Sequence, residues 1–138
     1  MEQPALYAKE TARVLGVLPF FHIFGLTMIL HAPLYMHRPV YVLPRFDFEQ
    51  FCATIQNCKI TFSCVVPPIL LQLAKSPLVQ NYDPSSLDAL LSGAAPLDAD
   101  LATQVKTRLG NVRIKQGKKN YRYICIYITN QWIGILRS

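Results

Sequence analysis

The stretch Ile60-Thr61-Phe62-Ser63-Cys64-Val65-Val66, followed directly by Pro67-Pro68, decides the fold class of this 138-residue chain. Its apolar and β-branched side chains are typical of a strand buried on both faces, as in a parallel sheet. The two prolines favour a helix start, because a proline at the first helical position gives up an N–H group that would have no intrahelical partner. The stretch therefore predicts one strand-to-helix unit of an α/β protein.

The same alternation of strand and helix extends on both sides of this unit. Short apolar runs predict further strands at residues 14–18, 39–43, 87–91 and 111–115. Helices are predicted at residues 20–35, after Asp47, from Pro67 to about Ser76, and from Pro96 to Gly110. Strands and helices that alternate at this spacing form βαβ units, so we expect an α/β fold with a mostly parallel sheet and flanking helices.

Charge and composition exclude several classes of function. The formal net charge is +6, but four of the 14 basic residues lie in the last 21 positions, which leaves +2 for residues 1–117. No basic face with interleaved aromatic residues precedes that tail, so we expect no nucleic-acid partner. The first ten residues include two glutamates and a lysine and no apolar core of a secretory signal, so a cytoplasmic location is expected.

Val14 to Tyr35 raises a membrane alternative, because it runs for about 22 residues without a formal charge. Pro19, His22 and Gly25 interrupt it, and such residues are costly or disruptive in a helix that faces lipid. A buried strand followed by a buried helix fits better. A membrane association is therefore the less favoured interpretation.

Several chemical motifs are missing. Gly117-Lys118 is the only Gly-Lys pair, and Val112 stands where a Walker loop needs its first glycine. The sequence contains no Gly-x-Ser-x-Gly elbow and no His-Glu-x-x-His zinc motif. Its four cysteines form no Cys-x-x-Cys pair, so we interpret them as small buried hydrophobes in a reducing compartment and expect no metal site.

Five short motifs stand at the carboxyl ends of the predicted strands, where open α/β sheets bind ligands. In chain order they are Leu18-Pro19-Phe20-Phe21-His22-Ile23-Phe24-Gly25, Val42-Leu43-Pro44-Arg45-Phe46-Asp47, Val65-Val66-Pro67-Pro68, Leu91-Ser92-Gly93-Ala94-Ala95-Pro96-Leu97 and Gln116-Gly117. An imidazole and a guanidinium suit anionic groups, and small residues let a flat base or an acyl chain lie close to the backbone. The motifs therefore predict a ligand site along this edge.

Together, in this order and spacing, the motifs resemble the 4-coumarate–CoA ligase and firefly-luciferase branch of the adenylate-forming, or AMP-binding, enzymes, over about residues 13–117. The resemblance implies a partial N-terminal AMP-binding domain at residues 1–117. It also implies the family's reaction, in which ATP activates a carboxylic acid to an acyl-adenylate and the acyl group then passes to coenzyme A. The ligands implied are a carboxylic acid, ATP, Mg²⁺ and coenzyme A.

The resemblance assigns roles to single residues. His22 corresponds to the family histidine at the mouth of the acyl pocket, which contacts the acyl-adenylate and gates access of the thiol. Arg45 falls where the family often has a lysine or arginine that meets a phosphate of coenzyme A. The remaining implied contacts are Phe24, Met28 and Ala94 with the acyl group, and Gly93, Ala95, Gln116 and Gly117 with the nucleotide.

Each of these residues also has a plainer interpretation from the residues alone. His22 fits a core or helix-start histidine, and Arg45 fits a solvated loop charge. Phe24 and Met28 lie four residues apart on an apolar helix, which is typical of core packing. Residues 92–96 form a suitable strand-to-helix turn with or without a ligand.

After Gly117 the resemblance stops inside the family's Gln-Gly-Tyr-Gly-x-Thr-Glu segment. Lys118 stands where the adenine-stacking tyrosine is expected, and residues 121–123 replace the threonine and glutamate that serve phosphate and magnesium. We interpret residues 118–138 as an unrelated tail, for which a translated intron is one origin. We therefore expect a truncated acyl-CoA ligase that is inactive as this chain, lacking also the family's phosphate loop and C-terminal catalytic domain. The alternative is a non-catalytic interaction or ligand-binding remnant that associates with a full-length relative.

Overall fold

The computed structural model describes residues 10–93, 96–110 and 112–116, and within them one five-stranded parallel sheet. The strands are β1 (Val14–Gly16), β2 (Val40–Val42), β3 (Phe62–Val65), β4 (Ala89–Ser92) and β5 (Arg113–Gln116), in the spatial order β2-β1-β3-β4-β5. Every neighbouring pair runs parallel. The predicted α/β class with a parallel sheet and flanking helices is confirmed.

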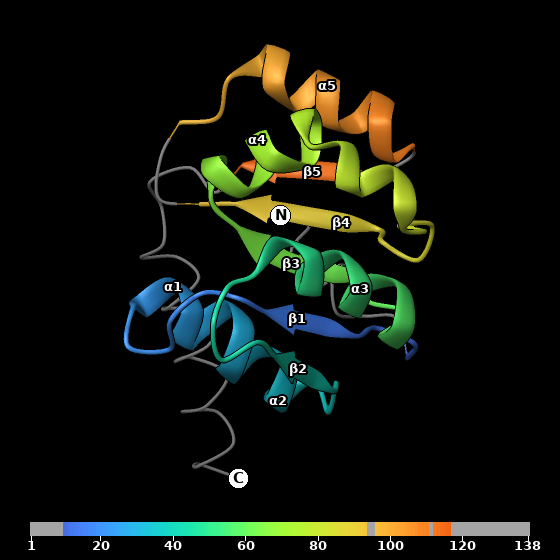
Figure 1. Ribbon diagram of the computed structural model, residues 1–138. Helices are drawn as coiled ribbons and strands as arrows, with labels where there is room; N and C mark the ends of the chain where they lie inside the picture. The colour runs from blue at the N-terminus through green and yellow to red at the C-terminus, as the bar shows by residue number, and fades with distance from the viewer. Residues whose placement is uncertain (1–9, 94–95, 111, 117–138) are drawn as a thin grey trace, which may run out of the picture.

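Helices cover both faces of the sheet (Figure 1). One face packs against α3 (Phe48–Cys58), α4 (Pro67–Lys75) and α5 (Ala99–Leu109), with the short 3-10 helix η3 (Pro77–Asn81) after α4. The other face packs, at β1, β3 and β4, against the helical run of α1 (Ile23–Gly25), η2 (Leu26–His31) and α2 (Ala32–Tyr35). Alternate residues of β3 and β4 join opposite core clusters, as the pleat requires.

The helical run at residues 23–35 differs from the regular helix that the sequence predicts for residues 20–35. It begins only at Ile23, and η2 is a π-helix in which the N–H of Ala32 donates to the carbonyl of Thr27, five residues earlier. Pro33 has no N–H with which to continue an α-helical ladder to Ile29, which favours the wider turn before it. The hydroxyl of Thr27 also donates to the carbonyl of Ile23.

The start of α5 also differs from the prediction. The sequence predicts that Pro96 opens this helix, but the helix begins at Ala99. The reason is the cap: the carboxylate of Asp98 accepts from the N–H of Asp100 at 3.2 Å, which fixes Asp98 in extended backbone at the N-cap. The predicted strand at residues 87–91 begins at Ala89, because the N–H of Leu87 still bonds within a turn to the carbonyl of Pro84 at 2.9 Å.

The remaining strand bounds shift by one or two residues. β1 ends at Gly16 rather than at residue 18, and β5 runs from Arg113 to Gln116. The interpretation of residues 118–138 as an unrelated tail concerns a segment outside the described residues. Among the residues described, no helix is long and apolar enough to cross a bilayer, and residues 14–35 contain a strand as well as helical segments.

Candidate functional site

The carboxyl ends of the five strands meet at one edge of the sheet, because all five strands are parallel. Along this edge the strands end, in spatial order, at Val42, Gly16, Val65, Ser92 and Gln116. The predicted site residues follow the same edge: Arg45 after β2, His22 after β1, Gly93 directly after β4, and Gln116 as the last residue of β5. The structure thus places four predicted residues from four strand ends at one edge. Ala94, Ala95 and Gly117 lie outside the described residues.

His22 is the N-cap residue of α1. The ring atom Nδ1 of His22 accepts from the backbone N–H of Phe24 at 3.2 Å, and the backbone N–H of His22 donates to the carbonyl of Pro19 at 3.3 Å. The side chain is exposed. The interpretation of His22 as a helix-start histidine is therefore confirmed, and the cap leaves the second ring nitrogen available for a further partner.

Phe24 and Met28 are core residues in this structure. Their side chains are buried and pack in the cluster that contains Val14, Ile29 and Phe62. Their implied role as lining of an acyl pocket stays a prediction. Both residues belong to the helical run that begins directly after His22. Their packing in the core therefore fixes this run, and the turn that carries His22, against the sheet.

Arg45 lies in a bend between β2 and α3, and its side chain is exposed. The structure therefore shows the solvated loop charge that the residues alone suggest. A contact with a phosphate of coenzyme A stays a prediction, and an exposed guanidinium beside the sheet edge is suited to it.

Ser92 is a feature of the edge to which sequence reasoning gave no role of its own. Its side chain is fully buried, and its Oγ has no hydrogen-bond partner in the described structure. Ser63, in the neighbouring strand β3, is equally buried, but its Oγ donates to the carbonyl of Leu15 at 2.9 Å. The sequence does carry a signal for this residue: Ser92 is a polar residue at the end of a buried apolar strand, directly before Gly93. Ser92 faces the same side of the sheet as Gln116, because the two residues are register partners.

Alanine substitutions at the two buried serines are expected to have opposite effects on stability. Ser63→Ala removes a satisfied buried hydrogen bond and lowers the free energy of unfolding by about 1 kcal/mol. Ser92→Ala removes a desolvated hydroxyl that has no partner in the described structure, so stability stays unchanged or rises by up to about 1 kcal/mol. Urea unfolding of the two variants checks the pair, and equal losses would show that Ser92 is bonded.

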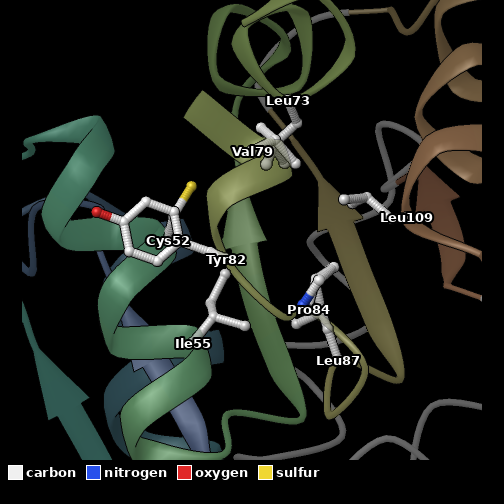
Figure 2. Close-up of a pocket in the computed structure, with 8 residues that line it drawn as sticks. All are labelled: Cys52, Ile55, Leu73, Val79, Tyr82, Pro84, Leu87 and Leu109. Atoms are coloured by element: carbon white, nitrogen blue, oxygen red, sulfur yellow. The ribbon is translucent and has the colours of Figure 1, made fainter. Parts of the chain in front are cut away.

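A small apolar cavity lies away from this edge (Figure 2). It has a volume of about 10 Å³, room for about one water molecule, and is lined by Cys52, Ile55, Leu73, Val79, Tyr82, Pro84, Leu87 and Leu109. Burial raises the pKa of the Cys52 thiol to about 11, so this thiol is protonated at neutral pH. The Tyr82 hydroxyl donates to the carboxylate of Glu49 at 3.1 Å, and this hydrogen bond is the main cause of its raised pKa. A neutral, apolar space of this kind is not suited to a nucleotide.

No metal centre is assembled within the described ranges, where no group of three or more histidine, cysteine, aspartate or glutamate residues could hold an ion. Burial raises the pKa of the Cys64 thiol as well, which keeps that thiol from acting as a ligand or nucleophile at neutral pH. The chemistry that the edge offers is therefore that of an imidazole, a guanidinium, an amide and backbone groups.

Comparison with known proteins gives consistent matches. The family model described as AMP-binding enzyme matches residues 1–117. A probable 4-coumarate–CoA ligase 1 of Dictyostelium discoideum is 44% identical over 110 residues, which are 79% of this chain and 20% of that protein. The 4-coumarate:CoA ligase 1 of Petunia hybrida is 40% identical over 116 residues, or 84% of this chain and 21% of that protein. The chain thus spans about a fifth of the length of these relatives.

Solved structures agree with these matches. The natural red emitting luciferase of Phrixothrix hirtus superposes with a TM-score of 0.72 at 37% identity, covering 82% of this chain and 29% of that chain. The O-succinylbenzoate coenzyme A synthetase of Bacillus subtilis, solved with ATP and magnesium ion, gives a TM-score of 0.64 at 26% identity over 72% of this chain and 20% of that chain. By these coverages the Phrixothrix hirtus chain is nearly three times as long as this one.

Proposed function

This chain belongs to the AMP-binding enzyme family, and we propose that its carboxyl edge forms part of the site where an ATP-dependent acid–CoA ligase holds an acyl-adenylate. The observation that carries the proposal is the placement of His22, Arg45, Gly93 and Gln116 at one edge of one parallel sheet. Open α/β sheets bind ligands at this edge.

Each residue at the edge offers a different interaction. The exposed imidazole of His22 is placed for an oxygen of the acyl-adenylate, and the exposed guanidinium of Arg45 for a phosphate of coenzyme A. Gly93 brings bare backbone to the edge, where its N–H already donates to the carbonyl of Val65 at 3.1 Å. Gln116 offers an exposed amide beside it. ATP, when bound, supplies the adenylate and the pyrophosphate leaving group, and Mg²⁺ neutralises phosphate charge.

The 138-residue polypeptide, expressed by itself, is proposed to bind the nucleotide weakly and not to turn over. Adenylation needs electrostatic stabilisation of a phosphoryl transition state. Positions 118–123 carry Lys, Lys, Asn, Tyr, Arg and Tyr, so they lack the Thr and Glu that the family resemblance assigns to phosphate and magnesium. The groups at the described edge orient a ligand but supply no such stabilisation for magnesium-bound phosphate.

Calorimetric titration with AMP tests the proposal. We expect saturable binding to the wild-type chain that weakens roughly tenfold in Gln116→Ala, since one amide contact is lost. The control is Arg113→Ala, at the opposite end of the same strand, which is expected to leave the affinity unchanged. The same preparation is expected to show no ATP–pyrophosphate exchange with aromatic or medium-chain carboxylic acids, 4-coumarate first. Equal affinities for the two variants, or no AMP binding, contradict the proposed site, and a clear exchange signal contradicts the proposed lack of turnover.

A second candidate function is association with a full-length relative, and exposed apolar side chains favour it. Six of the eight large apolar side chains that are exposed in the described structure lie between residues 21 and 46: Phe21, Ile23, Leu34, Tyr35, Val42 and Phe46. Among the residues that the structure describes, β2 is an edge strand and pairs only with β1. Unpaired strand edges and exposed apolar side chains both favour contact with another chain.

A charge placed on the exposed strand β2 is expected to weaken such an association. In sedimentation with the Petunia hybrida 4-coumarate:CoA ligase, Val42→Lys should weaken binding by roughly tenfold or more. Leu71→Lys on α4 is the matched control, since the exposed fractions of Val42 and Leu71 are 49% and 43%. The second candidate fails if the wild-type chain does not bind the ligase, or if both substitutions weaken binding equally.

A further inference from the structure

The turn that carries His22 also fixes the state of its imidazole. We infer that His22 is held as the tautomer protonated on Nε2, and that Gly25 is the positioning residue that holds the turn in place. The role of the imidazole toward a ligand rests on the proposed function. The tautomer and the positioning role do not, since they follow from contacts within the described chain.

The tautomer follows from the cap. The backbone N–H of Phe24 donates to Nδ1 of His22 at 3.2 Å, so Nδ1 offers a lone pair and carries no proton. In a neutral imidazole the single ring proton is then on Nε2. The exposed nitrogen of His22 is therefore a hydrogen-bond donor. It suits an oxygen acceptor such as a phosphate, carboxylate or acyl carbonyl, and it is not placed to take a proton as a base while the cap holds.

Gly25 allows the helix start to lie directly on the turn that follows β1. A Cβ at this position would stand 2.3 Å from the carbonyl oxygen of Pro19, 3.0 Å from its carbonyl carbon and 3.4 Å from the carbonyl oxygen of Leu18. All three atoms are backbone atoms, so no side-chain rotation relieves the overlap. A side chain at position 25 must therefore push the turn and the helix apart.

The displaced turn is the one that orients His22. The carbonyl of Pro19 accepts from the N–H of His22 at 3.3 Å, and the carbonyl of His22 accepts from the N–H of Leu26 at 2.9 Å. The backbone of His22 is thus hydrogen-bonded to Pro19, whose carbonyl lies against Gly25, and to Leu26, which follows Gly25 in the chain. A shift at position 25 is transmitted to the imidazole through these two hydrogen bonds and the cap itself.

Gly16 provides the matched control. A Cβ there would stand 2.7 Å from Cγ2 of Ile29, a side-chain atom, with the carbonyl oxygen of Tyr41 at 3.6 Å. Gly16→Ala therefore overlaps a buried side-chain atom, so the Ile29 side chain has to shift within the core, whereas Gly25→Ala overlaps backbone atoms of the turn itself. Both substitutions cost stability, but only the second is expected to change the surroundings of His22.

Long-range ¹H–¹⁵N correlation spectra of the histidine rings test the tautomer in the wild-type chain, in mildly alkaline buffer where free imidazole is neutral. We expect His22 to show an unprotonated Nδ1 and a protonated Nε2, with His31 and His37 as reference rings in the same spectrum. An unprotonated Nε2, or an equal mixture of the two tautomers, overturns the inference. The measurement needs no ligand, so a failure of AMP binding would bear on the proposed function alone.

The positioning role is tested by the two glycine variants. Gly25→Ala is expected to abolish the single-tautomer signature of His22, and Gly16→Ala to preserve it. Retention of the signature in folded Gly25→Ala, or its loss in both variants, overturns the role of Gly25.

If Gly25→Ala does not fold, amide exchange at Phe24 gives an independent test. His22→Asn keeps a side-chain acceptor at the N-cap and should retain the protection of this amide, whereas His22→Ala should speed its exchange roughly fivefold. Equal exchange in the two variants contradicts the cap, and with it the inferred orientation of the ring.

Discussion

Replacement of Phe51 by alanine is expected to lower the free energy of unfolding by about 3–5 kcal/mol, the usual cost of emptying a buried phenylalanine site. Phe51 is fully buried in the larger core cluster, where α3 packs on the sheet. Its ring also lies 5.9 Å from the ring of Phe46 and 6.4 Å from that of Phe48, centre to centre. The buried residues of α3 are Phe51, Cys52 and Ile55, so loss of this ring removes a large share of the buried contact between the helix and the sheet.

Phe21 supplies the control for this prediction. Its side chain is 94% exposed, so Phe21→Ala deletes the same ring from a solvent-exposed position and leaves no cavity in the core. We expect a change within about 0.5 kcal/mol. Denaturant unfolding of both variants gives the comparison, and similar losses in the two would show that the core around α3 is not formed as described.

The second large effect is expected at Arg108, which joins α5 to the end of α4. Its guanidinium donates to the carbonyl of Ala74 through Nη1 and to the carbonyl of Ser76 through Nη2, both at 2.5 Å. Arg108→Met keeps much of the aliphatic stem but leaves both carbonyls without this partner. We expect a loss of about 2–3 kcal/mol in the free energy of unfolding, because hydrogen bonds to a charged donor are the stronger kind.

Lys106→Met is the control for Arg108→Met, since Lys106 is an exposed cation in the same last turn of α5. Its loss should cost less than about 0.5 kcal/mol. Thermal unfolding at low and at high salt separates the two roles. If Arg108 acted only through the dipole of α5, the two variants would lose similar and equally salt-sensitive amounts.

The sequence predicts the number of the described strands, their succession along the chain and a mostly parallel sheet, because short buried strands alternate with amphipathic helices; the spatial order of the strands comes from the structure. It does not predict the details that depend on particular hydrogen bonds. The cap by Asp98 moves the start of α5 away from Pro96, and Pro33 changes the turn of the helix before it. Likewise the position of Arg108 in the last turn of α5 indicates only an interaction with the dipole of that helix, whereas its guanidinium donates to carbonyls at the end of α4.

The candidate site is predictable to the same extent. The parallel sheet brings the ends of β1, β2, β4 and β5 to one edge, so the sequence positions of His22, Arg45, Gly93 and Gln116 suffice to place them there. The state of a side chain is not readable in this way. The hydrogen bond from the Phe24 amide to Nδ1 of His22, and the lack of a partner for the Ser92 hydroxyl in the described structure, depend on side-chain positions that no spacing rule records.

Mapping the AMP contact on the sheet tests the central claim most directly. In a ¹H–¹⁵N correlation spectrum titrated with AMP, we expect the largest shifts at the backbone amides of Gly93, Gln116 and His22, at the carboxyl edge. The amides of Arg13 and Lys59, which precede β1 and β3 at the amino edge, should not move. Shifts centred on those two amides, or shifts spread evenly over the described residues, would contradict a nucleotide site at the carboxyl edge.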